Sequence, residues 1–256
     1  MMNLSKRVGA LLSKAVAAGA LVATAAMLSA TPAAALPVSG QGTWETTLLG
    51  RDVNGNAVSG NNASAVFLYD TALNVTWLRD ANNNGATNWN AANTWASGLN
   101  VGGFTGWRLP SMVDTGASGC DYNLAGGTDC GTNVQTATSE MAHLYYVTLG
   151  NLALCTPGDT TCVSPQAGYG LSNTGDFQNM QSDVYWSGLE YAPDTCCAWF
   201  FSTLSGGQSF AQKSDALYAL AVRPGDVVAA VPEPESLALV LVGLAAAGVA
   251  RRRRPL

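Results

Sequence analysis

Positive charge is scarce in the central part of this 256-residue sequence. Only five basic residues lie between positions 36 and 231, and one of them, Lys213, is a lysine. Fifteen acidic residues lie in the same segment, which gives it a formal net charge of −10. Such a surface repels polyanions, so it argues against nucleic acid as a partner and disfavours sulfated or acidic polysaccharides.

Residues that build common catalytic sites are also few. His143 is the only histidine, and Glu140 lies three residues before it on the same face of a predicted helix. That pair is half of a carboxylate-bridged metal site, but no second pair accompanies it. The chain has no phosphate-binding loop and no cofactor fingerprint, and its carboxylates show no paired spacing. We therefore expect no catalytic residues and no enzyme activity.

A long hydrophobic run is missing as well. The most apolar segment near the C-terminus, residues 237–250, has 14 residues and would span only about 21 Å as a helix. A bilayer core is about 30 Å thick and calls for about 20 apolar residues, so the segment is a poor permanent anchor. The four arginines after it would hold the C-terminus on the cytoplasmic side, as in a transient anchor. A tail-anchoring helix is the competing interpretation.

The tail has three parts in a fixed order. Pro232-Glu233-Pro234 comes first, the apolar run follows, and Arg251, Arg252, Arg253 and Arg254 come last. This order resembles the PEP-CTERM sorting signal, which exosortases recognise in exopolysaccharide-producing Gram-negative bacteria. The resemblance implies cleavage near the triplet, a transient inner-membrane intermediate, and release or transfer to the cell surface.

The N-terminus resembles a secretory leader. Lys6, Arg7 and Lys14 precede an alanine-rich apolar stretch, and Ala33-Ala34-Ala35 offers a cleavage site for signal peptidase. We therefore expect four segments: a signal peptide (1–35), a strand and loop extension (36–65), a folded domain (66–228) and the sorting signal (229–256).

All six cysteines lie in the expected exported segment: Cys120, Cys130, Cys155, Cys162, Cys196 and Cys197. An even number in an exported chain predicts disulfides, and six cysteines allow 15 pairings. The economical local pairs are Cys120–Cys130 and Cys155–Cys162. Adjacent Cys196 and Cys197 would be strained as a pair, so each is expected to join a different loop. A zinc site is the rival interpretation, but no C-x₂-C pair occurs.

Hydrophobic patterning predicts an α+β fold with two helices and short antiparallel strands. Residues 65–70 and 75–80 read as a strand pair, 88–100 as a helix capped by Asn88, and 139–150 as a second helix capped by Ser139. The second helix would bury a stripe formed by Met141, Leu144, Tyr145 and Leu149. Residues 184–188 form a further strand, the segments around Gly206-Gly207 form a hairpin, and 217–228 supply the last strand.

Several short motifs in these segments recur in one order: VTWLRDAN, WNAANTWASGLN, GGFTGWRLPSM, SEMAHLYY, VYWSG, AWFF, GGQ and YALAVRPGDV. Together they resemble the Lcl C-terminal domain family, over roughly residues 66–228. The resemblance implies a C-type-lectin-like fold and, by analogy with adhesin members, glycan binding. The cysteine-bearing segment 120–130 and the acidic charge depart from the family pattern, and the charge argues against a heparin-like ligand.

Residues 80–85 match the start of a calcium-binding loop. Asp80, Asn82 and Asn84 place oxygens at alternate positions, and Gly85 allows the sharp turn. The twelfth position is Ala91 instead of the bidentate glutamate, so calcium would bind weakly. The alternative is an asparagine-rich turn that leads into the helix at Asn88.

Ligand contacts are expected from aromatic residues in loops: Tyr122, Tyr169, Phe177 and Tyr191. The tryptophans on helices and strands are expected in the core instead, namely Trp77, Trp89, Trp95, Trp107, Trp186 and Trp199. Arg108 and Arg223 are expected to pair with acids such as Asp114 or Asp226 in a structural role.

The sequence thus predicts an exported, disulfide-stabilised protein of the cell surface or exopolysaccharide matrix, in which the domain binds polysaccharide without catalysis. Two alternatives stay open. The chain is a purely structural matrix component, or it is a cysteine-dependent oxidoreductase of the formylglycine-generating type. The oxidoreductase alternative requires a free thiol at Cys196 or Cys197 in an electropositive setting.

Overall fold

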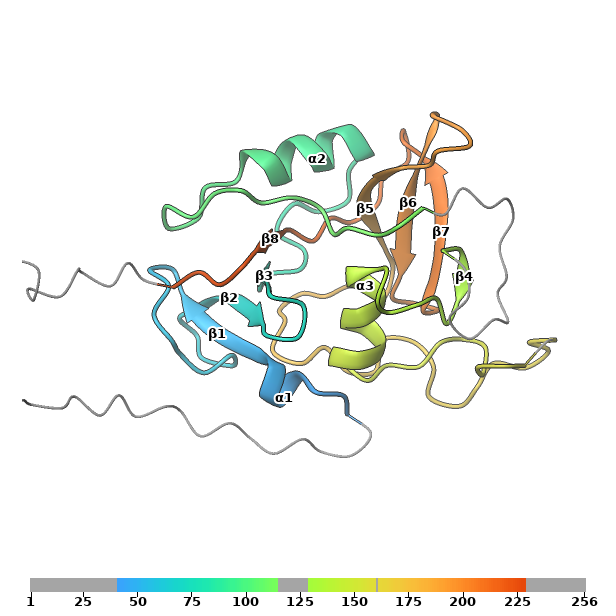
Figure 1. Ribbon diagram of the computed structural model, residues 1–256, viewed down its shortest axis with the longest axis horizontal. Helices are drawn as coiled ribbons and strands as arrows, with labels where there is room; N and C mark the ends of the chain where they lie inside the picture. Colours follow the sequence, from blue (N-terminus) through green and yellow to red (C-terminus); the bar gives the residue numbers. More distant parts are fainter. Residues whose placement is uncertain (1–40, 115–128, 160, 229–256) are drawn as a thin grey trace, which may run out of the picture. The chain divides into compact units, whose positions relative to one another are not determined.

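Two antiparallel four-stranded sheets form the body of the protein (Figure 1). The computed structural model describes residues 41–114, 129–159 and 161–228. The first sheet has the order β1-β2-β3-β8, with bounds Leu48–Asp52, Ala65–Asp70, Val75–Leu78 and Val222–Pro224. The second has the order β4-β7-β6-β5, with bounds Gly131–Thr132, Gly207–Gln212, Cys197–Ser202 and Val184–Glu190.

Helices are few and short in the described part of the chain. A single turn, α1 (Trp44–Thr47), precedes β1, and α2 spans Trp89–Gly98. The third helix begins as α3 (Glu140–Ala142) and continues as a π-helical segment, η1 (His143–Thr148). In Figure 1, α3 lies between the two sheets. Its buried side chains meet residues of both sheets in one core cluster, which includes Leu68, Trp77, Leu144, Tyr185 and Phe201.

The predicted strand pair at residues 65–80 is confirmed. β2 and β3 pair with Phe67 opposite Leu78 and Asp70 opposite Val75. Asn74 takes a φ of 53° in the turn between them, a conformation that asparagine tolerates better than most residues. The hairpin around Gly206 is also confirmed, since β6 and β7 pair with Ser202 opposite Gly207.

The last strand is much shorter than predicted. The prediction covered residues 217–228. Of these residues, only Val222–Pro224 forms a strand, which is β8 of the first sheet. Before β8 the chain hydrogen-bonds to other partners: Leu217 N donates to Thr87 O and Tyr218 N donates to Val184 O, both at about 3 Å. These residues connect the two sheets, and Leu220 and Ala221 are buried there. A backbone that changes partners cannot form one continuous ladder.

The second predicted helix is present, but its form differs from the prediction. Ser139 caps it as expected, because its hydroxyl accepts a hydrogen bond from Ala142 N at 3.2 Å. The predicted buried stripe of Met141, Leu144, Tyr145 and Leu149 is confirmed. Thr148 is also completely buried, where its hydroxyl donates to the Asp70 carboxylate at 3.3 Å. It lies seven residues after Met141, so it falls on the same helical face as the predicted stripe.

Helix α2 follows its prediction closely. The Asn88 side chain accepts a hydrogen bond from Ala91 N at 2.9 Å, which is the expected N-cap. Ala92 and Ala96 are fully buried on its inner face. Of the tryptophans expected in the core, Trp77, Trp107, Trp186 and Trp199 are buried, while Trp89 and Trp95 are half-buried on α2.

The arginines have structural roles, but the predicted partners were wrong. Arg108 forms two hydrogen bonds of 2.7 Å with Glu140, and Arg51, not Arg223, pairs with the Asp226 carboxylate at 2.6 Å. Arg223 donates to the backbone carbonyls of Thr105 at 3.1 Å and Asp226 at 3.4 Å, not to a carboxylate. The carboxylate partners of Arg51 and Arg108 come from elements distant in sequence, so proximity along the chain could not identify them.

Candidate functional site

The sorting and leader residues lie outside the described residues. This applies to Pro232, Glu233, Pro234, the four arginines at 251–254 and the predicted signal peptide. Within the described ranges, the structure contains no helix of sufficient length and apolar character to cross a bilayer.

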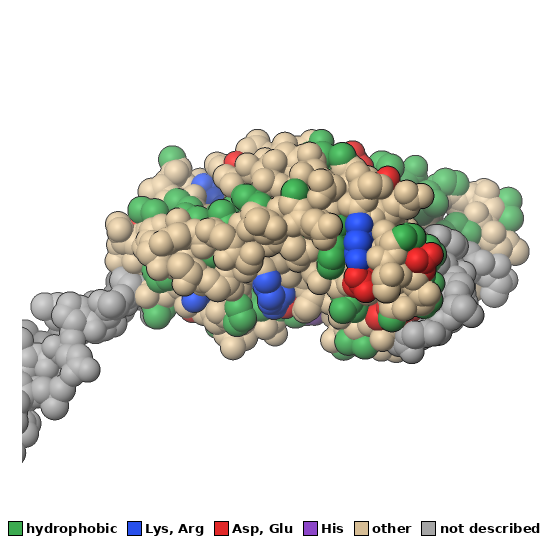
Figure 2. Space-filling model, turned by 90° about the horizontal axis from the view of Figure 1, so that it is seen from above, with side chains coloured by type: hydrophobic (Ala, Val, Ile, Leu, Met, Phe, Trp, Pro, Cys, Tyr) green, Lys and Arg blue, Asp and Glu red, His purple; other side chains and the backbone are tan. Residues whose placement is uncertain are grey.

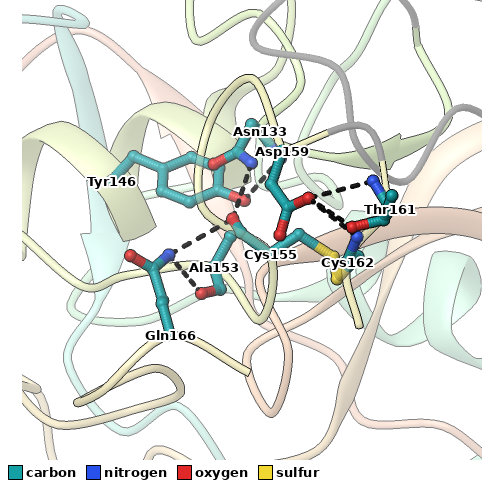
Figure 3. The surroundings of a disulfide bond; sticks show 8 residues. All are labelled: Asn133, Tyr146, Ala153, Cys155, Asp159, Thr161, Cys162 and Gln166. Atoms are coloured by element: carbon teal, nitrogen blue, oxygen red, sulfur yellow. Dashed lines mark hydrogen bonds between the residues drawn. A yellow bond between two sulfur atoms is a disulfide. The ribbon is translucent and has the colours of Figure 1, made fainter. Parts of the chain in front are cut away.

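A disulfide between Cys155 and Cys162 closes the loop that Figure 3 shows, with the two Cα atoms 5.2 Å apart. This confirms one of the two predicted local pairs. Asp159 stabilises the loop from inside: its carboxylate accepts from Thr161 N at 2.9 Å and from Cys162 N at 3.1 Å. These bonds favour the ionised form, which lowers the pKa of Asp159. Cys130 is also disulfide-bonded, and its expected partner Cys120 lies outside the described residues.

Side chains from distant segments fix the start of this loop. Asn133 Nδ2 donates to Cys155 O at 2.9 Å, and Gln166 Nε2 donates to Cys155 O at 3.2 Å (Figure 3). Tyr146 extends from η1, accepts from Asn133 N at 3.0 Å and donates to Gly206 O. Burial raises the pKa of Tyr146, so its hydroxyl stays protonated and keeps donating. The loop, the helix and the β6–β7 turn are therefore joined at one point.

Gly206 is required at this junction. Its φ is 68°, and a Cβ there would lie 2.8 Å from Tyr146 Oη and 2.9 Å from Ala153 Cα. Any larger residue would therefore push the β6–β7 turn away from the loop.

A hollow of about 460 Å³ opens beside Tyr146. Its lining combines uncharged polar and apolar residues: Asn133, Val134, Gln135, Thr136, Ala137, Tyr146 and Pro157. Sequence patterns did not predict this hollow, because segment 131–137 has neither periodicity nor a known motif. The signal in the sequence is a cluster of amide and hydroxyl side chains just before the second helix. Amide and hydroxyl groups that both donate and accept match the hydroxyl groups of a sugar.

The predicted aromatic ligand residues have different fates. Tyr169 is 42 % exposed and pairs through its backbone with Leu152, which is 44 % exposed. Phe177 and Tyr191 were wrong as surface candidates. Phe177 is 6 % exposed and packs edge-on against Trp77, and Tyr191 is 8 % exposed because Phe210 stacks on it at 3.9 Å between ring centroids. Tyr122 lies outside the described residues.

The candidate calcium loop is an asparagine-rich turn in this structure. Asp80 Oδ1 accepts from Asn82 N at 3.1 Å and from Asn179 Nδ2 at 3.0 Å, so protein donors already engage this oxygen. Asn82 Oδ1 is buried without a hydrogen-bond partner in the described structure. Ala91, at the twelfth position, lies in the first turn of α2. The loop therefore offers Asp80, Asn82 and Asn84 but no bidentate closing ligand, which favours the turn over an EF-hand site.

His143 lies in a polar contact with Thr148. The distance from His143 Nδ1 to Thr148 Oγ1 is 3.3 Å, and Thr148 in turn contacts the buried Asp70 carboxylate. Burial lowers the pKa of His143, and the Asp70 charge opposes this effect. Glu140, the residue expected to share its face, is instead bound by Arg108 and by Ser111 N at 2.7 Å. His143 is thus a helix residue with a polar neighbour.

Cys196 and Cys197 are free thiols, in contrast to the expected disulfides. They lie where the β5–β6 connection enters β6, and Cys196 is exposed while Cys197 is buried. Asp194 accepts a hydrogen bond from Cys196 N at 3.1 Å. The hydrogen bond with Cys197, desolvation and the Asp194 carboxylate raise the pKa of Cys196 to about 12. A protonated thiol is a poor nucleophile, so this setting does not suit the oxidoreductase alternative.

The tail is the part of the chain that comparison with known proteins identifies. Residues 230–254 match the PEP-CTERM protein-sorting motif. This match supports the predicted sorting signal and implies export with processing by exosortase, toward the cell surface, through a transient C-terminal membrane anchor. A search of curated proteins gave no match.

Proposed function

We propose that this chain is an exosortase-sorted protein of the cell surface or exopolysaccharide matrix of a Gram-negative bacterium, and that its body binds a neutral glycan without catalysis. The observation that carries the proposal is the sorting motif at 230–254, because a motif of this kind marks an exported, cell-surface-directed protein, and glycans are ligands available at a cell surface. The resemblance of residues 66–228 to the Lcl C-terminal domain family, with its C-type-lectin-like fold, supports the same assignment.

The hollow beside Tyr146 is the proposed glycan site. Its volume of about 460 Å³ lies within the range of ligand pockets, roughly 300–1,000 Å³. Gln135 and Thr136 offer hydrogen-bonding groups, and the exposed Ala137 and Pro157 offer apolar contacts for the faces of a sugar ring. The disulfide loop and Tyr146 hold these walls in place, which limits the entropy that binding must cost.

The charge of the protein favours a neutral glycan over an anionic one. The segment 36–231 carries a net charge of −10, and the lining of the hollow has no charged residue. Figure 2 shows a face on which uncharged polar side chains and backbone cover most of the surface, with basic side chains in small separate patches. An anionic chain would meet repulsion without a compensating cluster of arginines.

A glycan array with the purified full chain tests this proposal, in calcium and in a chelator. The variant with Q135A and T136A together should bind a neutral glycan about tenfold more weakly, because two hydrogen bonds of about 0.5–1.5 kcal/mol each are lost. N90A, an exposed change on α2, is the matched control and should bind normally.

The other outcomes separate the alternatives. No binding of any glycan by the wild type would favour a purely structural matrix protein. Binding that survives the double variant but is lost in Y169A would move the site to the exposed Tyr169. Binding that requires calcium would indicate that the loop with Asp80 takes part in the site.

A further inference from the structure

The entrance to β6 brings three potential metal ligands together. The side-chain donor atoms of Asp194, Cys196 and Cys197 all lie within 4.8 Å of one another. Asp194 and Cys196 are exposed, so a solvated ion can reach them. Cys197 is 7 % exposed and borders a cluster with Met112, Tyr191 and Trp199. The donors therefore lie at the boundary between solvent and an apolar cluster.

The separation of the donors suits a tetrahedral ion. Zinc binds thiolate sulfur at about 2.3 Å and carboxylate oxygen at about 2.0–2.2 Å, so two ligands of a tetrahedral ion are about 3.5–3.8 Å apart. Donors within 4.8 Å can reach this distance through small side-chain rotations. Two sulfurs and one carboxylate are also ligand types that zinc accepts.

The backbone around the donors is fixed. Cys197 N donates to Asp194 O at 3.1 Å, Tyr191 N donates to Cys197 O at 3.0 Å, and Lys213 N donates to Cys196 O at 2.9 Å. Ligands on a fixed backbone lose little chain entropy when they bind an ion. A disulfide between the two cysteines is disfavoured as well, because adjacent Cα atoms are about 3.8 Å apart and disulfides prefer about 4.4–6.8 Å.

We propose that Asp194, Cys196 and Cys197 form a binding site for a thiophilic metal ion such as Zn²⁺, a property beyond the proposed glycan binding. Both thiols lose their protons to solvent as the ion binds, so one ion releases two protons. Water or an external ligand completes the fourth position. Lys213, whose backbone N–H donates to Cys196 O, does not place its charge on the ion, because its amine pairs with Glu190 and lies 4.8 Å from the Trp89 ring centroid.

The test uses the purified full chain with Cd²⁺ and Zn²⁺ as probes. Thiol titration of the unreduced, denatured protein should give two thiols per chain. Cd²⁺ should then produce the ultraviolet charge-transfer band of cadmium–thiolate bonds at one ion per chain, and Zn²⁺ should displace it. C196S should abolish the band, and D194N should weaken Cd²⁺ binding by at least about tenfold, no less than the loss of an outer-shell partner costs.

Two controls make a negative result decisive. D215N removes an exposed carboxylate shortly after β7 and should leave the affinity for Cd²⁺ unchanged. Cys196 is exposed, so C196S should keep the wild-type urea midpoint and separate loss of a ligand from loss of folding. The proposal is overturned if the wild type shows no thiols, if it gives no cadmium–thiolate band, or if C196S binds Cd²⁺ as tightly as the wild type.

Discussion

Two segments of this protein share the pattern Asp-Thr-x-Cys but use it differently: residues 159–162 and residues 194–197. In both, the aspartate accepts a hydrogen bond from the backbone N–H two residues later, from Thr161 at 2.9 Å and from Cys196 at 3.1 Å. The first segment ends in a disulfide to Cys155, whereas the second ends in two adjacent thiols.

This difference shows that the aspartate-centred turn does not decide whether its cysteine forms a disulfide or stays a free thiol. Cys155 lies seven residues before Cys162, and this spacing allows the two Cα atoms to sit 5.2 Å apart. Adjacent cysteines cannot reach that separation, so the second segment keeps its donors available. The loop 155–162 is stabilised by a covalent crosslink, while the β6 entrance depends on the apolar cluster beneath it.

The largest effect should come from removing that cluster. Trp199 is 1 % exposed, and its indole N–H donates to Asp114 at 2.9 Å. We expect W199A to lower the free energy of unfolding by about 3–5 kcal/mol, measured by urea denaturation. F210A removes a ring that is 38 % exposed and packs edge-on against Trp199, and it should cost clearly less. Equal losses would mean that burial of Trp199 does not support the β6 entrance.

The second effect tests the crosslink. C155S and C162S together open a short loop, which should lower the free energy of unfolding by about 2–3 kcal/mol through the entropy of the unfolded chain. C196S, which breaks no crosslink, should change it by less than about 0.5 kcal/mol. Similar urea midpoints for the two variants would remove the distinction between the segments.

A smaller effect should separate the two aspartates. The Asp159 carboxylate accepts from Thr161 N, from Thr161 Oγ1 at 2.8 Å and from Cys162 N, and Asp194 accepts one backbone bond, from Cys196 N. D159N should therefore lower the thermal midpoint at pH 7 more than D194N does. The reverse order would show that these hydrogen bonds do not stabilise the loop.

The smallest expected effect is the pH dependence of the difference in thermal midpoint between the wild type and D159N. The folded-state pKa of Asp159 is lowered below its usual value of 3.8, so its ionised form contributes stability above that pH. The contribution is lost as the pH falls below about 3.8 toward the folded-state pKa. Thermal midpoints of the wild type and D159N should therefore converge between pH 5 and pH 2, and a constant difference would contradict this linkage.

Local patterns predicted the regular elements well. The strand pair β2–β3, the cap at Asn88 and the buried stripe of the second helix follow from alternation, capping chemistry and helical spacing. Predictions of side-chain exposure were poorer, because exposure depends on which residues from other segments pack against the side chain. Phe177 is in the core because it meets Trp77, and Tyr191 is covered because Phe210 stacks on it.

The sequence by itself determined the acidic charge, the sorting motif and the order of most helices and strands, and it offered Cys155–Cys162 as one economical pair among 15 possible pairings. These features depend on composition or on residues close together in the chain. Only the tertiary structure decided the partners of Arg51 and Arg108, the hollow beside Tyr146 and the meeting of Asp194 with two thiols above Trp199. Each of these features depends on contacts between segments far apart in sequence or on the direction in which the folded backbone points its side chains. Local propensity predicts neither of them.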